Sequence, residues 1–290
     1  MKLSRNDECW CGSHKKYKKC HLAFDERLEQ LKRAGHKIPT HKMIKNEEQI
    51  EGIRKAAVVN NGLLDYIEQN IKAGMSTEEI DQMTQAYLKE HGAKSADLNY
   101  QGYPKSICTS VNDEVCHGIP DPSVILKDGD IINVDATTNL NGYFADASRM
   151  FLIGEVSEEA KKLVEETKNC LYKGMEAIKP WESTIGDIGE AIQTYAESLG
   201  YSVVREFCGH GVGLKMHEDP YVFHFKPNEP TVVIVPGMVF TIEPMINQGT
   251  KNIHLGSKND WTAYTDDGKL SAQWEHTFLV TEDGVEIISK

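Results

Sequence analysis

The chain contains no run of about 18 uninterrupted apolar residues, the length that a membrane-spanning helix requires. Its first ten residues, MKLSRNDECW, lack the apolar core of a secretory signal. Three of the seven cysteines crowd into residues 9–20, and in a reducing compartment clustered cysteines bind metal more often than they form disulfides. We therefore expect a cytoplasmic protein that does not associate with membranes.

Basic residues are too few to balance the acidic ones, with 32 Lys and Arg against 44 Asp and Glu, a net charge of −12. The deficit is uneven, because residues 1–45 hold 12 basic and 5 acidic residues while residues 46–290 hold 20 and 39. A basic tip on an acidic body is typical of an appended interaction module; a merely solvated basic face is the alternative. We expect two units, residues 1–45 and residues 46–290, and the second is long enough to bury a core without disulfides.

The basic segment contains a closely spaced set of metal-ligand residues, Cys9, Cys11, Cys20 and His21. Three sulfurs and one imidazole suit a tetrahedral structural zinc. The alternative is a set of unrelated free thiols, but so short a segment needs a metal to fold. Four lysines between the ligands predict a basic surface for nucleic acid or an acidic partner. They are Lys15, Lys16, Lys18 and Lys19.

The second unit contains a diverged internal repeat with an offset of 107–108 residues. The pattern Ile-Lys followed by Ser-Thr at 71–77 recurs at 178–184, and Gly129 and Gly237 each stand six residues before an acid. Each half opens with two helices, whose starts are marked by Asn46 with Gln49 and by Ser76 with Glu79 in the first half, and then continues in strands. Helices followed by strands, twice over, predict an α+β fold with two pseudo-twofold-related halves. The predicted strands are 131–134, 143–153, 203–207, 232–235, 239–242 and 273–280.

Five residues in distinctive contexts form a candidate ligand set for two metal ions: Asp135, Asp146, His210, Glu243 and Glu275. Any one of these acids alone would be read as a helix cap or a turn residue. Together they carry about four negative charges, which two divalent cations would neutralise. Oxygen-rich ligands with one imidazole favour cobalt, manganese, iron or zinc. The set therefore predicts metal-assisted hydrolysis.

The surrounding motifs resemble those of the type I methionine aminopeptidases, of the pita-bread fold, from about residue 45 to residue 290. The motifs are GYPKSIC, VNDEVCHGIP, INVDA, ADASRMF, CGHGVG, MHEDP, FTIEPM and LSAQWEHTFLV. Residues 5–22 resemble the SEC-C zinc motif. The resemblance implies an antiparallel sheet covered by helices, preceded by a small zinc knuckle, and the removal of initiator methionine from nascent chains and peptides.

The resemblance also assigns roles to matching residues. Asp135 would bind one metal, His210 and Glu243 the other, and Asp146 and Glu275 both. His217 would hydrogen-bond the developing oxyanion and His117 the scissile amide or the leaving group, so that His117, His217 and Glu243 form the catalytic set. The methionine pocket would be lined by Tyr100, Tyr103, Cys108 and Trp261.

The sequence departs from the family pattern at Asp97, where a small apolar or thiol residue is frequent, and at Met216, where an aromatic residue is common. Residues 222–236 are expected to form a surface loop on the active-site side, in which no partner supports His224 as a ligand. Asp97 and Met216 affect the expected shape of the methionine pocket and do not change the predicted metal ligands.

Two rival functions are compatible with parts of the sequence. A proline-specific dipeptidase or aminopeptidase P would share the five ligands but carry a long N-terminal domain, for which about 45 residues leave no room. A docking protein without catalysis would have degenerate ligands, and all five are intact. We expect a monomer whose basic module docks on ribosomes or a translation factor. Ligand type does not fix the metal used in the cell.

Overall fold

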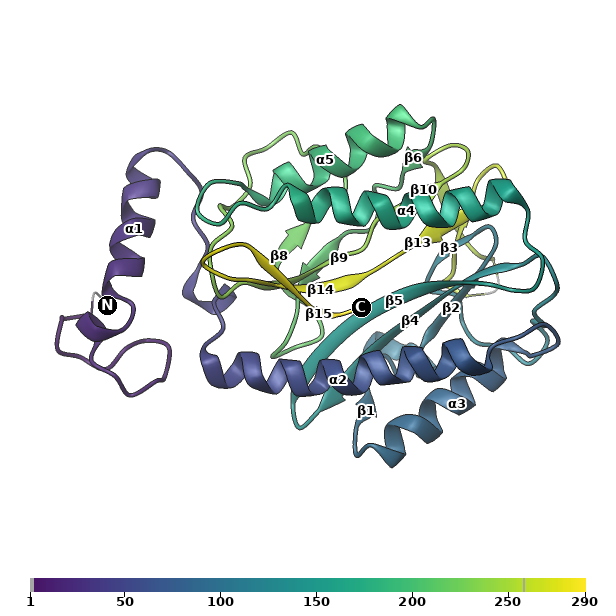
Figure 1. Ribbon diagram of the computed structural model, residues 1–290, viewed down its shortest axis with the longest axis horizontal. Helices are drawn as coiled ribbons and strands as arrows, with labels where there is room; N and C mark the ends of the chain where they lie inside the picture. The colour runs from purple at the N-terminus through teal and green to yellow at the C-terminus, as the bar shows by residue number, and fades with distance from the viewer. Residues whose placement is uncertain (1–2, 258) are drawn as a thin grey trace.

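The computed structural model describes residues 3–257 and 259–290. Its helices are α1 (Leu22–Arg33), α2 (Glu47–Asn70), α3 (Thr77–Glu90), α4 (Glu158–Glu176) and α5 (Ile185–Ser198). Single 3-10 turns occur at η1 (Tyr17–Lys19), η2 (His41–Met43) and η3 (Tyr100–Gly102). In Figure 1, α4 and α5 cover the strands on one side and α2 and α3 cover them on the other, while η1 and α1 lie at one end. No helix in these described ranges combines the length and the apolar character needed to cross a bilayer.

The strands pair antiparallel throughout the sheets. The first half contributes β1 (Lys94–Ser95), β2 (Cys108–Val111), β3 (Glu114–Cys116), β4 (Ile131–Leu140) and β5 (Tyr143–Leu152). The second contributes β6 (Ser202–Val203), β7 (Gly209–Gly211), β8 (Glu218–Val222), β9 (Val239–Ile242), β10 (Met245–Asn247), β11 (Ile253–Leu255), β12 (Ala263–Thr265), β13 (Ser271–Gln273), β14 (His276–Val280) and β15 (Val285–Ser289). One sheet joins β1, β4 and β2, with β5 also on β4, and another has the order β15-β14-β9-β7-β8. Two smaller sheets, β13-β10-β6 and β11-β12-β3, complete the arrangement.

The helix starts follow from local capping chemistry. Asn46 closes a capping box with Gln49 at the start of α2, and Ser76 closes one with Glu79 at the start of α3. Each box satisfies backbone N–H groups that the first helical turn leaves free. The helix starts predicted at these two positions are therefore confirmed.

The internal repeat is reproduced in backbone contacts. Ser76 forms a β-bridge with Ile125, and Thr184, 108 residues later, forms one with Val233. Gly129 and Gly237 both adopt a positive φ, +94° and +86°, which a side chain would strain. Both halves thus make the same turn before the strand that leads to an acid, which confirms the expected α+β fold with two related halves.

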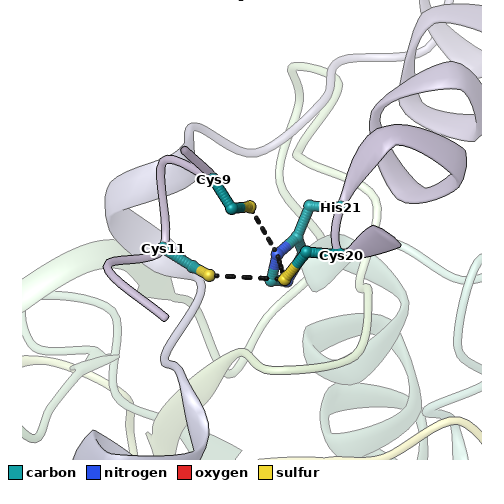
Figure 2. Close-up of side chains that lie close together, drawn as sticks. All are labelled: Cys9, Cys11, Cys20 and His21. Atoms are coloured by element: carbon teal, nitrogen blue, oxygen red, sulfur yellow. Dashed lines mark hydrogen bonds between the residues drawn. The ribbon is translucent and has the colours of Figure 1, made fainter. Parts of the chain in front are cut away.

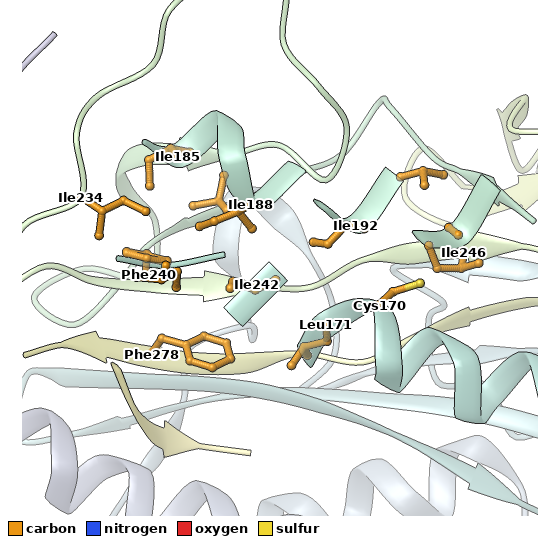
Figure 3. Close-up of a cluster of buried hydrophobic side chains, with 14 of the residues drawn as sticks. Cys170, Leu171, Ile185, Ile188, Ile192, Ile234, Phe240, Ile242, Ile246 and Phe278 are labelled. Atoms are coloured by element: carbon orange, nitrogen blue, oxygen red, sulfur yellow. The ribbon is translucent and has the colours of Figure 1, made fainter. Parts of the chain in front are cut away.

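The second half has the larger hydrophobic core. Figure 3 shows α4 and α5 packing side chains such as Leu171 and Ile188 against Phe240 of β9 and Phe278 of β14, all fully buried. A second cluster lies under α2 and α3 and includes Leu63, Leu64 and Ile80. Burial of these apolar side chains explains why the helices lie on the outside of the sheets.

The N-terminal segment packs on the second half. Leu28 of α1 and Ile44 are buried in the larger core. Phe24 contacts Trp181 with ring centroids 4.9 Å apart, and the side chain of Asn46 donates a hydrogen bond of 2.7 Å to the carbonyl of Cys11. Residues 23–45 are therefore a docked element as well as a connection.

Two predicted strands are wrong. Residues 232–235 form only isolated bridges, to Lys37 and to Thr184, because the segment hydrogen-bonds across the start of α5. The strand predicted at 203–207 stops after Val203 in β6. Residues 232–235 bond instead to backbone groups before and at the start of α5. Beyond Val203, the N–H of Val204 still donates to Met245 at 3.1 Å, but that of Arg205 donates to the side chain of Glu206.

Candidate active site

One hollow of about 400 Å³ is lined by every residue predicted for the two-metal site, for catalysis and for the methionine pocket. These residues are Tyr100, Tyr103, Cys108, His117, Asp135, Asp146, His210, His217, Glu243, Trp261 and Glu275. Asp97 and Met216 line it as well. Residues up to 175 positions apart in the chain thus meet in one place.

Strand register brings the acids together. Asp135 on β4 and Asp146 on β5 lie on neighbouring strands, since Asp146 pairs with Thr137, two residues beyond Asp135. Glu275 directly precedes β14 and Glu243 directly follows β9, and the pair His276 with Ile242 places these two acids side by side. A β-bridge between Ser148 and Glu275 joins the two halves at this point.

His210 on β7 completes the cluster. Its Nε2 lies 3.7 Å from Asp146 Oδ2 and 3.6 Å from Glu243 Oε1. Its Nδ1 lies 3.0 Å from the carbonyl of Gly211, so it is Nδ1 that donates and Nε2 that presents its lone pair to the acids. Burial lowers the pKa of His210 to about 3, which keeps the ring neutral and able to coordinate.

Burial has the opposite effect on the acids. It raises the pKa of Asp135 to about 6 and that of Glu243 to about 8. Burial, with the negative charges of neighbouring acids, also raises the pKa values of Asp146 and Glu275 well above the usual range. So many buried carboxyl groups in one place are stable only when protonated or when neutralised by cations.

The donor set fits divalent cations. Oδ1 of buried Asp146 has no hydrogen-bond partner within the described part of the chain. One ligand atom from each of Asp146, His210 and Glu275 lies within 4.8 Å of the others. Separations of about 3.4 Å are expected between neighbouring ligands around a small divalent cation with bonds of about 2.1 Å, close to those of the His210 Nε2 contacts.

Two further histidines face the hollow. His217 shares a hydrogen bond of 2.7 Å between Nδ1 and the hydroxyl of Tyr100, and its ring lies 4.2 Å from that of His210. His117 follows β3 in a left-handed conformation, φ +56°, and meets the ring of Phe207 edge-on at 5.0 Å. Burial, with the nearby His217, lowers the pKa of His117 to about 4, so the ring is neutral at neutral pH.

Aromatic side chains also line the hollow, next to the histidines. Tyr103 is buried, meets Trp261 in a T-shaped contact at 5.1 Å, and its hydroxyl donates to the carbonyl of Gly118 at 2.9 Å. Cys108 pairs directly with Asp135 across β2 and β4. The carboxylate of Asp97 accepts a hydrogen bond of 3.1 Å from the backbone of Thr137. Burial and the charge of Asp135 raise the pKa of Asp97 well above its usual range, which favours the protonated form of this acid in the wall.

Sequence reasoning missed two supporting residues. The hydroxyl of Thr241 donates to Glu243 Oε1 at 2.7 Å and accepts from the backbone of His210 at 3.0 Å, which ties two candidate ligands together. Nε2 of buried His224 accepts from the backbone of Glu243 at 3.1 Å. The position of Thr241 within FTIEPM was an available signal, whereas no local motif marked His224 as a support for Glu243. His224 and residues 232–235 are buried, so the expectation of a surface loop over 222–236 is wrong for these parts.

The N-terminal metal-ligand residues also converge (Figure 2). Cys9 Sγ lies 3.2 Å and Cys20 Sγ 3.1 Å from His21 Nδ1, and Cys11 Sγ lies 3.6 Å from Cys20 Sγ. Zinc–sulfur bonds of about 2.3 Å in a tetrahedron place sulfurs about 3.7 Å apart, so the set fits zinc. Burial raises the pKa of Cys9 to about 11, and metal binding there would release the thiol proton.

Comparisons with known proteins agree with this geometry. Residues 51–282 match metallopeptidase family M24, and residues 5–23 match the SEC-C motif. The chain is 42% identical over 294 residues to a methionine aminopeptidase of Chlamydia trachomatis, covering 99% of each chain. It is 46% identical over 247 residues to the enzyme of Escherichia coli K12, covering 85% of this chain and 93% of that one. The crystal structure of methionine aminopeptidase from Rickettsia prowazekii superposes with a TM-score of 0.82 at 42% identity, over 85% of this chain and 99% of that one.

A pseudo-twofold α+β fold around a buried cluster of acids and one imidazole is that of a metal-dependent peptidase, and the chain belongs to metallopeptidase family M24. Within that family it belongs to the methionine aminopeptidases, with the pita-bread fold expected from the motifs and a SEC-C motif in front. Prolidase from Pyrococcus furiosus shares the fold, at 23% identity and a TM-score of 0.68. The superposition covers 86% of this chain and 65% of the prolidase.

Proposed function

We propose that the chain hydrolyses the first peptide bond of nascent proteins and peptides that begin with methionine, through the residues gathered in the hollow around His210. The observation that carries the proposal is the convergence of five candidate metal ligands, two histidines and an aromatic wall in one cavity of about 400 Å³. A cavity of this size suits one side chain and the first peptide bond.

Asp135, Asp146, His210, Glu243 and Glu275 would hold two divalent cations, drawn from cobalt, manganese, iron and zinc. When bound, the cations supply an activated water molecule and polarise the carbonyl of the first peptide bond. Thr241 holds Glu243 and His210 in position, since its hydroxyl contacts both. A ligand set fixed in this way on the strands and next to them keeps the reacting groups within a narrow range of geometry.

His217 is proposed to stabilise the negative charge that develops on the carbonyl oxygen. When the hydroxyl of Tyr100 donates to Nδ1, the proton of the neutral ring lies on Nε2. A fixed N–H donor aimed at a developing oxyanion contributes most when the ring is already oriented. His117, held between Phe207 and Trp261, is proposed to bind the scissile amide or the leaving group.

Tyr100, Tyr103, Cys108 and Trp261 are proposed to bind the methionine side chain. The edge-on packing of Tyr103 and Trp261 gives a rigid, polarisable surface suited to a thioether. Burial raises the pKa of Cys108 well above its usual range, so this thiol serves as a neutral wall and not as a nucleophile.

The chain is proposed to divide into a SEC-C zinc extension with its connection, residues 1–45, and a catalytic domain, residues 46–290. We propose that it acts as a monomer in the cytoplasm. A second role, docking on ribosomes or a translation factor, is favoured by the exposed side chains of the four lysines between the zinc ligands.

The function is tested by comparing kcat/KM for the peptides Met-Ala-Ser and Ala-Pro-Ala with the metal-loaded protein. The proposal predicts release of methionine from the first peptide and little turnover of the second. Faster cleavage of the proline peptide would instead favour a proline-specific peptidase.

A further inference from the structure

The N-terminal module and the catalytic domain together enclose a second hollow of about 760 Å³. One wall comes from the module and from η2, and includes Trp10, His41 and Met43. The opposite wall comes from β8 and the loop before it, and includes Leu214 and Tyr221. β8 is an edge strand of its sheet, since β7 is its only partner strand among the described residues.

This hollow adjoins the active site. His217 and Tyr221 line both cavities. Tyr221 pairs directly with His210 across β7 and β8, so the same short segment of β8 borders the candidate metal centre and the second hollow. A polypeptide whose first residue lies in the active site therefore has a path past His217 into the space beside the zinc module.

Both walls of the hollow are rigid. The ring of Trp10 stacks on His41 at 3.9 Å and 6°, and Asp25 accepts from Trp10 Nε1 at 3.0 Å and contacts His41 Nε2 at 2.9 Å. On the other side the buried Lys45 holds Glu218 in an ion pair of 2.7 Å. A preformed groove binds a flexible chain at a lower entropic cost than one that must first order itself.

The chemistry of the lining suits a polypeptide of variable sequence. Leu214 and Tyr221 are exposed apolar side chains, 37% and 63% accessible, beside the polar groups of Lys42 and Asp219. Among the described residues, the charged lining residues are Lys42, Lys215, Asp219 and Glu218, the last paired with Lys45, so neither charge is in strong excess. The lysines between the zinc ligands are not part of this lining, which argues against a nucleic acid as the occupant.

We propose that this hollow, the module groove, is an extended substrate site that binds the residues of the polypeptide following the second one. The zinc module thereby forms part of the substrate-binding surface and favours longer chains over short peptides. An extended chain advances about 3.3 Å per residue, so only substrates longer than a tripeptide reach far into the groove. The inference rests on the proposed aminopeptidase function.

The test compares Met-Ala-Ser with an octapeptide that begins with the same three residues. Leu214→Ser should lower kcat/KM for the octapeptide by about fivefold and for the tripeptide by less than about twofold, because only the longer chain loses an apolar contact. If wild-type protein does not cleave the tripeptide, the proposed function is wrong. If Leu214→Ser lowers kcat/KM equally for both peptides, only the proposed role of the module groove is wrong.

A matched control is available at Leu255, which is 53% exposed and lines another hollow of about 410 Å³ that also reaches His117 and Trp261. Leu255→Ser should leave the preference for the octapeptide unchanged. If Leu255→Ser reduces that preference and Leu214→Ser does not, the chain leaves by the other hollow and the proposal is wrong.

Cross-linking gives a second readout that does not depend on turnover. An octapeptide with a non-cleavable reduced first bond and a photoreactive phenylalanine analogue at its fourth residue should label Trp10 or Met43. Labelling confined to residues 253–255, or no labelling near the module, would contradict the proposed path.

Discussion

At the scale of single residues, Glu275 shows how one position connects the two halves of the molecule. Its backbone bridges Ser148 of the first half, and it directly precedes β14 of the second. Burial and the charges of Asp146 and Glu243 raise its pKa well above the usual range. Without metal, burial therefore favours the protonated form of this side chain, which must lose its proton to bind a cation.

Glu275→Gln tests this account. Glutamine resembles the protonated acid, so the metal-free variant should keep the thermal midpoint of the metal-free wild type. It cannot supply the carboxylate, so kcat/KM for Met-Ala-Ser should fall by more than about 10²-fold, and added manganese should no longer raise the thermal midpoint.

Cys108→Ser is the control for that substitution. Cys108 lies beside Asp135 in the same hollow, so the variant should keep the stabilisation by manganese and mainly change the preference between methionine and norleucine peptides. Equal losses of activity and metal response in both variants would argue against the separate roles of ligand and pocket wall.

At the scale of elements, the repeat places the same helix start in each half. Ser76 opens α3 and Thr184 opens α5, and each also bridges the segment that runs in front of its helix. Thr77 donates its backbone N–H to Val124 at 3.0 Å, and Ile185 donates to Val232 at 3.0 Å. The two halves thus stabilise equivalent junctions with equivalent bonds.

We expect Ser76→Ala and Thr184→Ala each to lower the free energy of unfolding by about 1 kcal/mol. The first removes the hydroxyl that accepts from the backbone N–H of Glu79, and the second removes the hydroxyl that donates to the carboxylate of Asp187 in the first turn of α5. Urea unfolding of the two variants and of the double variant provides the measurement. The double variant should show the sum of the two losses, because the junctions share no partner. A loss at one site only would mean that the two junctions are not energetically equivalent.

At the scale of the whole molecule, the N-terminal segment differs from the rest of the chain in charge but shares its hydrophobic core. The basic residues concentrate in the first 45 positions, while the apolar side chains of Leu28 and Ile44 from that same segment belong to the core of the second half. The module is therefore fixed on the body through apolar contacts and presents its lysines outward. A rigidly held basic surface can orient the active site toward an anionic partner.

Docking is tested by reversing the charges of Lys15, Lys16, Lys18 and Lys19 to glutamate. Cosedimentation with ribosomes should fall by at least about tenfold at low salt, and the salt dependence of the remaining binding should weaken. The rate on Met-Ala-Ser should stay within about twofold of wild type, because these side chains lie outside the active-site lining. Unchanged cosedimentation would exclude the lysines as the docking surface.

Much of the candidate site could be predicted from the sequence. Buried acids next to apolar strand residues need cations, and three cysteines with a histidine at close spacing need zinc. Residue type and local context were therefore sufficient to select Asp135, Glu243 and Cys9 among others. The repeat was also readable, because turn and cap residues such as Gly129 act locally.

The rest was decided by tertiary structure. The bond between Tyr100 and His217 spans 117 positions, the support of Glu243 by His224 depends on a buried loop, and residues 232–235 exchange a predicted strand for bonds at a helix start. The groove beside Trp10 exists only because the module packs on the second half. Local sequence determines which groups need partners, but which partner they meet depends on the burial of apolar surface across the whole chain.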